Sequence, residues 1–307
     1  MAQNDFAFSG VYAAALTPLT DDLDPDIGLM ADHCRWLLGN GCDGLAILGT
    51  TGEANSFGLK ERIAILNGLA EAGIPTDTLM PGTGSCALPD AIALTQVAMD
   101  IGAAGVLMLP PFYYKNPSDD GLFAAYSEVI QKIGDDKLKI CLYHFPQMSG
   151  VPIPYSLIER LLKEYPGTVV GMKDSSGVAD NMIGAAKEFP GFAVFAGSDE
   201  LMLPLIEAGG AGCITACANV GSEMAGVVYQ GWLNGEDIQA AHETLTAIRN
   251  TIVKFPLSTA LKTLMARHSG NDGWLNIRPP LMRMSDADRN TLYETFDAIG
   301  FQVPLAA

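Results

Sequence analysis

The sequence predicts an α/β protein of the (β/α)8 barrel class with a helical extension at its C-terminal end. Apolar runs of strand length alternate with segments of helical spacing, and eight such pairs follow one another within about 225 residues. This even alternation is typical of a closed barrel of parallel strands, because an open doubly wound sheet rarely repeats the unit so often. The residues after the eighth pair show helical spacing and no further strand. We therefore expect a barrel over residues 1–234 and a helical subdomain over residues 235–307.

Each predicted strand is a short apolar run that ends in turn-forming residues, and each predicted helix places apolar residues three or four positions apart. The strands are expected at residues 11–19, 44–48, 78–82, 106–109, 139–145, 169–173, 192–196 and 212–217. The helices of the barrel are expected at residues 27–38, 59–72, 87–101, 122–133, 155–164, 181–189, 201–208 and 223–233. The extension is expected to hold helices at residues 237–252, 259–268 and 286–299.

Composition excludes several classes of function. The chain has 49% hydrophobic and 17% charged residues, which indicates a compact globular enzyme. No apolar run is long enough to cross a bilayer and residues 1–6 show no signal-peptide pattern, so we expect a cytoplasmic protein. The net charge of −17 argues against nucleic acid or an anionic membrane as a partner, because both are bound through an excess of Lys and Arg. Six scattered cysteines without a CxxC pair and four histidines without metal-ligand spacing indicate reduced thiols and no metal site.

Lys173 is the residue that most needs an explanation. It ends the apolar run of the sixth predicted strand, and polar, turn-forming residues follow it. Ammonium groups are rarely buried unless they are paired. A lysine here could extend into solvent or pair with an acid, and either arrangement would carry no chemistry. The alternative is a nucleophile that forms a Schiff base with a carbonyl substrate.

Strand alternation favours the nucleophile. With a period of two, Lys173 and Ser175 share one face of the strand while Asp174 takes the other, so the adjacent acid is a poor partner for the amine. Tyr143 lies on the neighbouring predicted strand and can face inward beside Lys173. An ordinary lysine is neutral in only about one molecule per 2,500 at pH 7, and removal of water favours the neutral, nucleophilic amine. Tyr143 can then exchange protons with the substrate if a second hydroxyl, from Thr50 or a loop tyrosine, bonds to it.

Other polar residues follow the predicted strands, at the end of a barrel where active sites are built. The turn Gly49–Glu53 offers successive N–H groups and hydroxyls that could hold a small carboxylate, although an ordinary strand-to-helix turn would look the same. Tyr113 and Tyr114 follow the fourth strand, and Asp199 and Glu200 follow the seventh.

Five motifs identify a family resemblance. GTTGE at 49–53, PPFYY at 110–114, YHFP at 143–146, GMKDSSG at 171–177 and AGSDE at 196–200 resemble, in order and spacing, the pyruvate-dependent class I aldolase family that includes dihydrodipicolinate synthase and N-acetylneuraminate lyase. The resemblance implies a TIM barrel, a homotetramer or dimer of dimers, pyruvate or another 2-oxo acid as the small-molecule partner, and an imine on Lys173 without any cofactor. It implies that Tyr143 is the general acid and base, with Thr50 and Tyr114 completing its relay and Tyr114 commonly supplied across a subunit interface. Thr51 would join Thr50 in holding the pyruvate carboxylate, and Ser175, Gly197 and Ile214 are further candidates for the substrate site.

The resemblance leaves the second half of the substrate open. Dihydrodipicolinate synthases typically carry an arginine two residues beyond the proline of the tyrosine motif, where it grips the carboxylate of aspartate semialdehyde; Met148 stands at that position here. Loss of a charge-assisted pair costs about 1.5–3 kcal/mol, so Met148 argues against that substrate. Asp199 and Glu200 resemble the segment of sialic acid lyases that accepts hydrogen bonds from a polyol, although they also suit the first turn of a helix.

We therefore expect a lyase that acts on an unphosphorylated 2-oxo acid, such as a 2-keto-3-deoxy sugar acid. The alternatives are dihydrodipicolinate synthesis, dehydration of a keto-deoxy sugar acid, and a barrel that binds ligands without catalysis.

Overall fold

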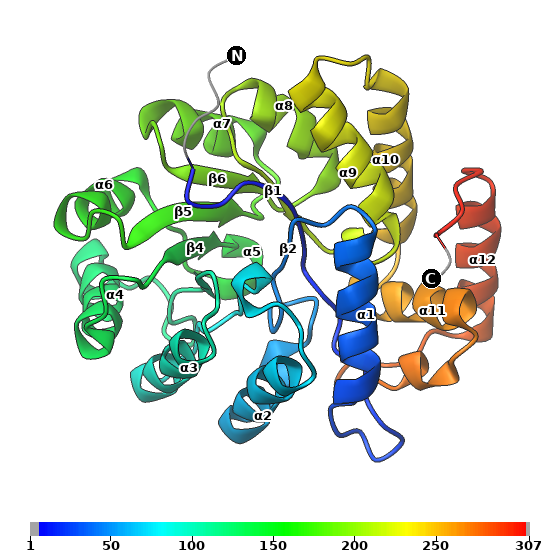
Figure 1. The fold of residues 1–307 in the computed structure, drawn as a ribbon, viewed down its shortest axis with the longest axis horizontal. Coiled ribbons are helices and arrows are strands. Elements are labelled where there is room, and N and C mark those ends of the chain that lie inside the picture. Colours follow the sequence, from blue (N-terminus) through cyan, green and yellow to red (C-terminus); the bar gives the residue numbers. More distant parts are fainter. Residues whose placement is uncertain (1–5, 305–307) are drawn as a thin grey trace.

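The computed structural model describes residues 6–304 and shows a closed barrel of parallel strands surrounded by helices, as predicted (Figure 1). Residues 1–5, which entered the argument about a signal peptide, lie outside the described residues. The paired strands follow the order β2-β1-β7-β6-β5-β4-β3. They are β1 Gly10–Ala13, β2 Gly44–Leu45, β3 Val106–Met108, β4 Ile140–His144, β5 Val169–Asp174, β6 Ala193–Ala196 and β7 Gly212–Thr215.

The segment 79–82 closes the barrel between β2 and β3. Leu79 forms a parallel bridge with Leu45, and Gly82 forms one with Leu107. The predicted strand at 78–82 is therefore present in position but reduced to two bridges. Pro81 interrupts it because a proline has no N–H to donate to the ladder, and Thr78 belongs instead to a 3-10 helix, Thr76–Thr78.

The helices match the predicted segments, with ends that differ by at most five residues. The largest difference is at α9, which begins five residues earlier than predicted and is kinked at Gly221. A short helix, α5, directly after β4 was not predicted, and four 3-10 turns were also missed. The helices are α1 Ile27–Gly39, α2 Leu59–Glu71, α3 Leu88–Asp100, α4 Asp119–Ile133, α5 Pro146–Ser149, α6 Tyr155–Glu164, α7 Ala179–Glu188, α8 Met202–Glu207, α9 Ala218–Asn234, α10 Gln239–Ile252, α11 Leu257–Ser269 and α12 Asp286–Asp297.

Alternation along the strands separates two apolar layers. Cys141 and Phe195 belong to the cluster that fills the barrel, whereas their chain neighbours Leu142 and Val194 pack outward against the ring of helices. The inner cluster is small, and it leaves the carboxyl ends of the strands to polar residues. This division decides which side chains can reach the interior of the barrel.

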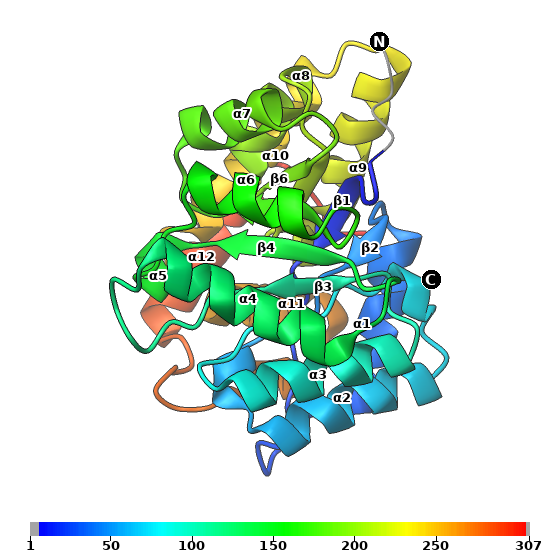
Figure 2. The ribbon, with the colours of Figure 1, turned by 90° about the vertical axis from the view of Figure 1, so that its left-hand side faces the viewer.

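The C-terminal helices pack against the barrel rather than standing apart from it. Figures 1 and 2 show α10, α11 and α12, coloured from yellow to red; α10 and α11 pack against α9, and α12 packs against α10 and α11. Their apolar side chains share one buried cluster with Leu16 from the segment after β1 and with Val220 of α9. The division of the chain at residue 234 stays a prediction. Among residues 6–304, no helix has the length and apolar character that a membrane crossing requires.

Asn219 fastens α9 to β1 and to α1. Its side-chain N–H2 donates to the carbonyls of Ala14 and Ala216, so its Oδ1 must be the acceptor. This oxygen accepts from the N–H of Leu16 at 3.0 Å and lies 2.8 Å from His33 Nε2, which therefore carries the proton. His33 Nδ1 is buried and has no partner within the described residues. Protonation of Nδ1 would bury a charged N–H without an acceptor, and burial accordingly lowers the pKa of His33 from 6.5 to about 4.

This arrangement predicts that stability falls as the pH is lowered. The unfolded chain takes up a proton at His33 near pH 6.5, whereas the folded chain does so only near pH 4. The free energy of unfolding should therefore lose on the order of 2 kcal/mol from this group between pH 7 and pH 5. Urea denaturation of the native protein and of His33→Gln at both pH values measures this contribution, because the other titrating groups are common to the two proteins. An equal loss in both proteins would contradict the assignment.

Candidate active site

Lys173 and Tyr143 lie side by side at the carboxyl ends of β5 and β4. The two residues are direct partners in the parallel register, and Lys173 Nζ lies 4.6 Å from the centroid of the Tyr143 ring. Both side chains are about 95% buried, at 4% and 5% exposure. The predicted pairing of an inward lysine with an inward tyrosine on the next strand is confirmed by this register.

Asp174 points away from Lys173, as strand alternation predicted. Its Oδ1 accepts from the N–H of Ser176 at 2.8 Å, and its Oδ2 accepts from the side-chain amide of Asn181 on α7 at 2.6 Å. Within residues 6–304, no carboxylate lies within 4.0 Å of the Lys173 amine. The amine is therefore buried without an ion pair, in contact with an aromatic face instead.

Thr50 completes a pair of hydroxyls above the amine. Its Oγ1 lies 3.2 Å from the Tyr143 hydroxyl, and either group can donate. A hydroxyl pair of this kind can pass a proton in either direction without a change in heavy-atom positions. Cys141 faces inward on the same strand as Tyr143. Burial raises the pKa of its thiol to about 12, so this cysteine is neutral and unreactive.

The Gly49–Glu53 turn has the properties of an anion cradle. Within the described residues, the N–H groups of Thr50, Thr51 and Gly52 donate to no protein acceptor. Positive φ angles of 54° at Leu48 and 56° at Glu53 flank these groups, and such angles are uncommon for residues with side chains. Consecutive free N–H groups beside two hydroxyls suit the two oxygens of a carboxylate.

His144 supports the loop beyond Tyr143 from the outer side of β4. Its Nδ1 accepts from the N–H of Ile153 at 3.0 Å, which ties together the two ends of the loop that contains α5. Burial lowers the pKa of His144 although Asp174 opposes the shift, so the neutral ring that can accept this bond is favoured. Met148 lies on α5 with 60% of its surface exposed.

Tyr114 does not reach the Tyr143 hydroxyl within this single chain. It is 78% exposed and packs edge to face against Tyr113, with ring centroids 5.4 Å apart. Lys115 anchors the same loop by donating to the carbonyl of Ser149 at 2.8 Å. The aromatic pair therefore projects from an anchored loop into solvent.

Asp199 and Glu200 lie in a 3-10 helix, Asp199–Leu201, and bind groups of the protein. Asp199 is fully buried; its Oδ2 accepts from the Thr215 hydroxyl at 2.6 Å and lies 3.5 Å from Arg249 of α10. Arg249 Nε lies 3.0 Å from Glu200. Burial raises the pKa of Asp199, while Arg249 and the Thr215 hydrogen bond oppose the shift. Because Ile214 faces the interior, its neighbour Thr215 faces outward, and the Asp199 carboxylate lies outside the barrel. Substrate binding by these two acids stays a prediction.

The remaining predicted residues lie around Lys173. Ile214 belongs to the inner cluster, and a Cβ on Gly197 would stand 2.2 Å from the Ser175 hydroxyl, so only glycine allows these two strand ends to meet. Their roles in substrate binding also stay predictions.

Three residues that contact the site were not predicted from the sequence. Phe195 is the register partner of Lys173 on β6 and forms part of its apolar wall. Arg249 neutralises the acids after β6, and Lys262 pairs with Glu53 of the turn. A signal was present for Lys262, since a lysine between Leu261 and Leu264 interrupts the apolar face of a predicted helix.

Comparison with known proteins agrees with this geometry. The model of the dihydrodipicolinate synthetase family matches residues 7–299. A protein of Chloroflexus aurantiacus described as an uncharacterized DapA-like lyase is 33% identical over 291 residues, which are 94% of this chain and 96% of that protein. The 4-hydroxy-tetrahydrodipicolinate synthase of Bacillus subtilis is 27% identical over 295 residues, which are 95% of this chain and 99% of that protein.

Among solved structures, the crystal structure of dihydrodipicolinate synthase from Agrobacterium tumefaciens is 34% identical with a TM-score of 0.87, and the match covers 94% of this chain and 99% of that one. The chain therefore belongs to the dihydrodipicolinate synthetase family, whose enzymes are class I lyases and synthases that hold pyruvate as an imine on a lysine and need no external cofactor.

Proposed function

We propose that this enzyme forms an imine between Lys173 and a 2-oxo acid, and that it cleaves an unphosphorylated 2-keto-3-deoxy sugar acid to pyruvate and an aldehyde. The observation that carries the proposal is the buried, unpaired amine of Lys173 against Tyr143, whose hydroxyl lies 3.2 Å from Thr50.

Imine formation uses these three groups in sequence. The carboxylate of the 2-oxo acid binds the free N–H groups of the Gly49–Glu53 turn and the hydroxyl of Thr51. The neutral amine of Lys173 attacks C2, and the carbonyl oxygen takes a proton from the Tyr143 hydroxyl. The new ammonium returns a proton to Tyr143, a second protonation of the C2 hydroxyl releases water, and the C=N bond forms. The hydroxyl pair with Thr50 allows Tyr143 to give and take protons in turn.

Cleavage follows because the imine accepts electrons. Loss of the proton from the C4 hydroxyl breaks the C3–C4 bond, releases an aldehyde, and places the electron pair in an enamine. Protonation at C3 and addition of water at C2 then return the amine and release pyruvate. The same steps in reverse condense pyruvate with an aldehyde.

Met148 supports the choice of an unphosphorylated sugar acid. Its side chain is exposed on α5, in the loop that follows Tyr143, and a thioether offers no charge for a phosphate or a second carboxylate. The names of the relatives favour a second candidate, condensation of pyruvate with aspartate semialdehyde. That reaction would need another cation for the second carboxylate.

We also propose that the enzyme works as a homotetramer or dimer of dimers in which Tyr114 enters the site of a neighbouring subunit. The exposed Tyr113–Tyr114 pair on a loop anchored by Lys115 supports this assignment.

Reduction with borohydride tests the imine. Incubation with pyruvate and borohydride should add the mass of one reduced pyruvate to the peptide that contains Lys173, because the reduced C–N bond is permanent. Lys173→Ala should abolish the label, while Lys187→Ala, an exposed lysine of α7, should keep it. Absence of label on the native enzyme, when a control aldolase is labelled, would overturn the proposed function.

The Tyr143–Thr50 hydroxyl pair predicts that substitutions at the two positions slow imine trapping to different degrees. Tyr143→Phe should slow the initial rate of imine trapping by roughly 10²–10⁴-fold, because general acid–base catalysis contributes about that factor. Thr50→Val should slow it by roughly 2- to 10-fold through loss of one hydrogen bond. Thr50→Ser keeps the hydroxyl and should stay close to the native rate; a loss equal to that of Thr50→Val would show that the methyl group, not the hydroxyl, matters.

Met148 predicts substrate choice. Met148→Arg should raise kcat/KM for aspartate semialdehyde by about 10- to 100-fold, as expected for a new charge-assisted pair. Met148→Gln, of similar length but uncharged, should not. Pyruvate release from a panel of 2-keto-3-deoxy sugar acids measures the native preference. Efficient native turnover of aspartate semialdehyde would favour the synthase, and a 2-oxo acid product that retains all carbons would indicate dehydration.

A further inference from the structure

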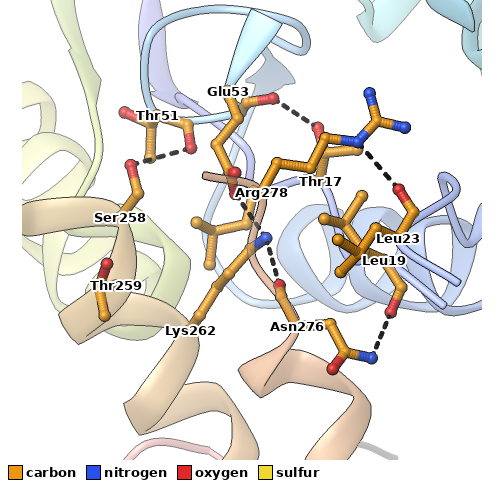
Figure 3. A network of polar contacts seen from close by, with 12 residues as sticks. Thr17, Leu19, Leu23, Thr51, Glu53, Ser258, Thr259, Lys262, Asn276 and Arg278 are labelled. Atoms are coloured by element: carbon orange, nitrogen blue, oxygen red, sulfur yellow. Dashed lines mark hydrogen bonds and ion pairs between the residues drawn. The ribbon is translucent and has the colours of Figure 1, made fainter. Parts of the chain in front are cut away.

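The C-terminal helix α11 places a buried cation directly behind the predicted carboxylate-binding turn. Figure 3 shows Lys262 extending from α11 to the side chain of Glu53, the last residue of the turn. Lys262 Nζ lies 2.5 Å from Glu53 Oε1, with side-chain exposures of 2% and 0%. An ion pair this deeply buried links the C-terminal helices to the active-site end of the barrel.

The ammonium is fixed from two sides. Besides Glu53, it donates to the carbonyl of Asn276 at 3.0 Å, and the Asn276 side chain in turn donates to the carbonyl of Leu19 at 3.1 Å (Figure 3). Burial lowers the pKa of Lys262, and the charge of Glu53 opposes this shift. Glu53 Oε2 is buried and has no hydrogen-bond donor within the described residues. Among residues 6–304, Lys262 is therefore the cation that lies within 4.0 Å of this carboxylate.

The rest of the turn is held by neighbours on both sides. Ser258, one turn earlier on α11, donates to the carbonyl of Thr51 at 3.2 Å. Thr17, after β1, donates to the carbonyl of Gly52 at 2.8 Å. These bonds occupy the carbonyl groups of Thr51 and Gly52, while the N–H groups of the same residues have no acceptor within the described residues. Two of the three anchors, Ser258 and Lys262, come from the same helix.

The backbone of Glu53 explains why its side chain needs an anchor. Its φ of 56° and ψ of 31° lie in the left-handed region that non-glycine residues seldom occupy. Without its partner, the buried carboxylate would turn toward water, and the backbone would leave this conformation. The neighbouring N–H groups of Thr51 and Gly52 would then lose their present positions.

We propose that the Glu53–Lys262 ion pair is a positioning device through which α11 sets the geometry of the Gly49–Glu53 turn and hence the affinity of the enzyme for the carboxylate of its 2-oxo acid. The proposal rests on the proposed function, because it assigns the turn to carboxylate binding. A pair that served stability alone would change the melting temperature and leave the affinity of the folded enzyme unchanged.

The test separates affinity from stability. The rate of borohydride trapping on Lys173 is measured against pyruvate concentration, at a temperature where circular dichroism shows each variant to be folded. Lys262→Met should raise the half-saturating pyruvate concentration by about tenfold and change the rate at saturation much less, the pattern of lost ground-state binding. Leu292→Ala, a buried residue of α12 in the C-terminal cluster, is the matched control. It should lower the melting temperature and leave half-saturation within about twofold of the native value.

A second variant covers the case in which Lys262→Met does not fold, because a single substitution leaves Glu53 buried and unpaired. Glu53→Gln combined with Lys262→Met removes both charges and should also raise the half-saturating concentration. A folded variant of either kind with native half-saturation would overturn the proposal while leaving the proposed function intact. A native enzyme that pyruvate and borohydride do not label would overturn both.

Discussion

The burial of one amine without a counterion is the constraint on which this active site depends. On strand β5, Lys173 faces into the barrel and Asp174 faces out of it. The nearest acid in the sequence therefore accepts hydrogen bonds from Ser176 and Asn181 instead of pairing with the amine. Had the register of β5 shifted by one residue, the acid would face inward and the lysine would lie among the helices. Everything that keeps β4, β5 and β6 in register therefore also keeps the Lys173 amine unpaired.

The register also explains why a tyrosine is the partner. Parallel pairing places Tyr143 directly beside Lys173, and the ring offers the amine an aromatic face while its hydroxyl extends to Thr50. A carboxylate in this place would form an ion pair with the amine. A phenol can exchange protons with a substrate without forming such a pair. In the proposed function, the inner residue Tyr143 transfers protons, while the outer residue His144 holds the loop that carries Met148.

Much of the fold and the centre of the site could be predicted because both follow from local patterns. A period of two places Lys173 and Tyr143 inside and Asp174 outside, whatever the details of the barrel. The third predicted strand lies at the expected place, but the sequence did not show that its pairing would be limited to two bridges on either side of Pro81. The contacts of Asp199 and Glu200 with Arg249 of α10 could not be predicted, because no local pattern in the sequence identifies a partner so distant in the chain. The same holds for Glu53 and Lys262, which only tertiary packing brings together.

The two halves of the chemistry are consequently built in different ways. Lys173 and Tyr143 are buried at the strand ends, and the Gly49–Glu53 turn is held by hydrogen bonds from Thr17, after β1, and from Ser258 of α11. By contrast, Met148 on α5 and the Tyr113–Tyr114 pair, which the proposed function places around the rest of the substrate, are largely exposed. Substitutions in these exposed elements disturb few interactions of the barrel, whereas substitutions behind the turn disturb many. Under the proposed function, a barrel organised in this way can accept another aldehyde through changes in its loops while it keeps the same lysine, tyrosine and turn.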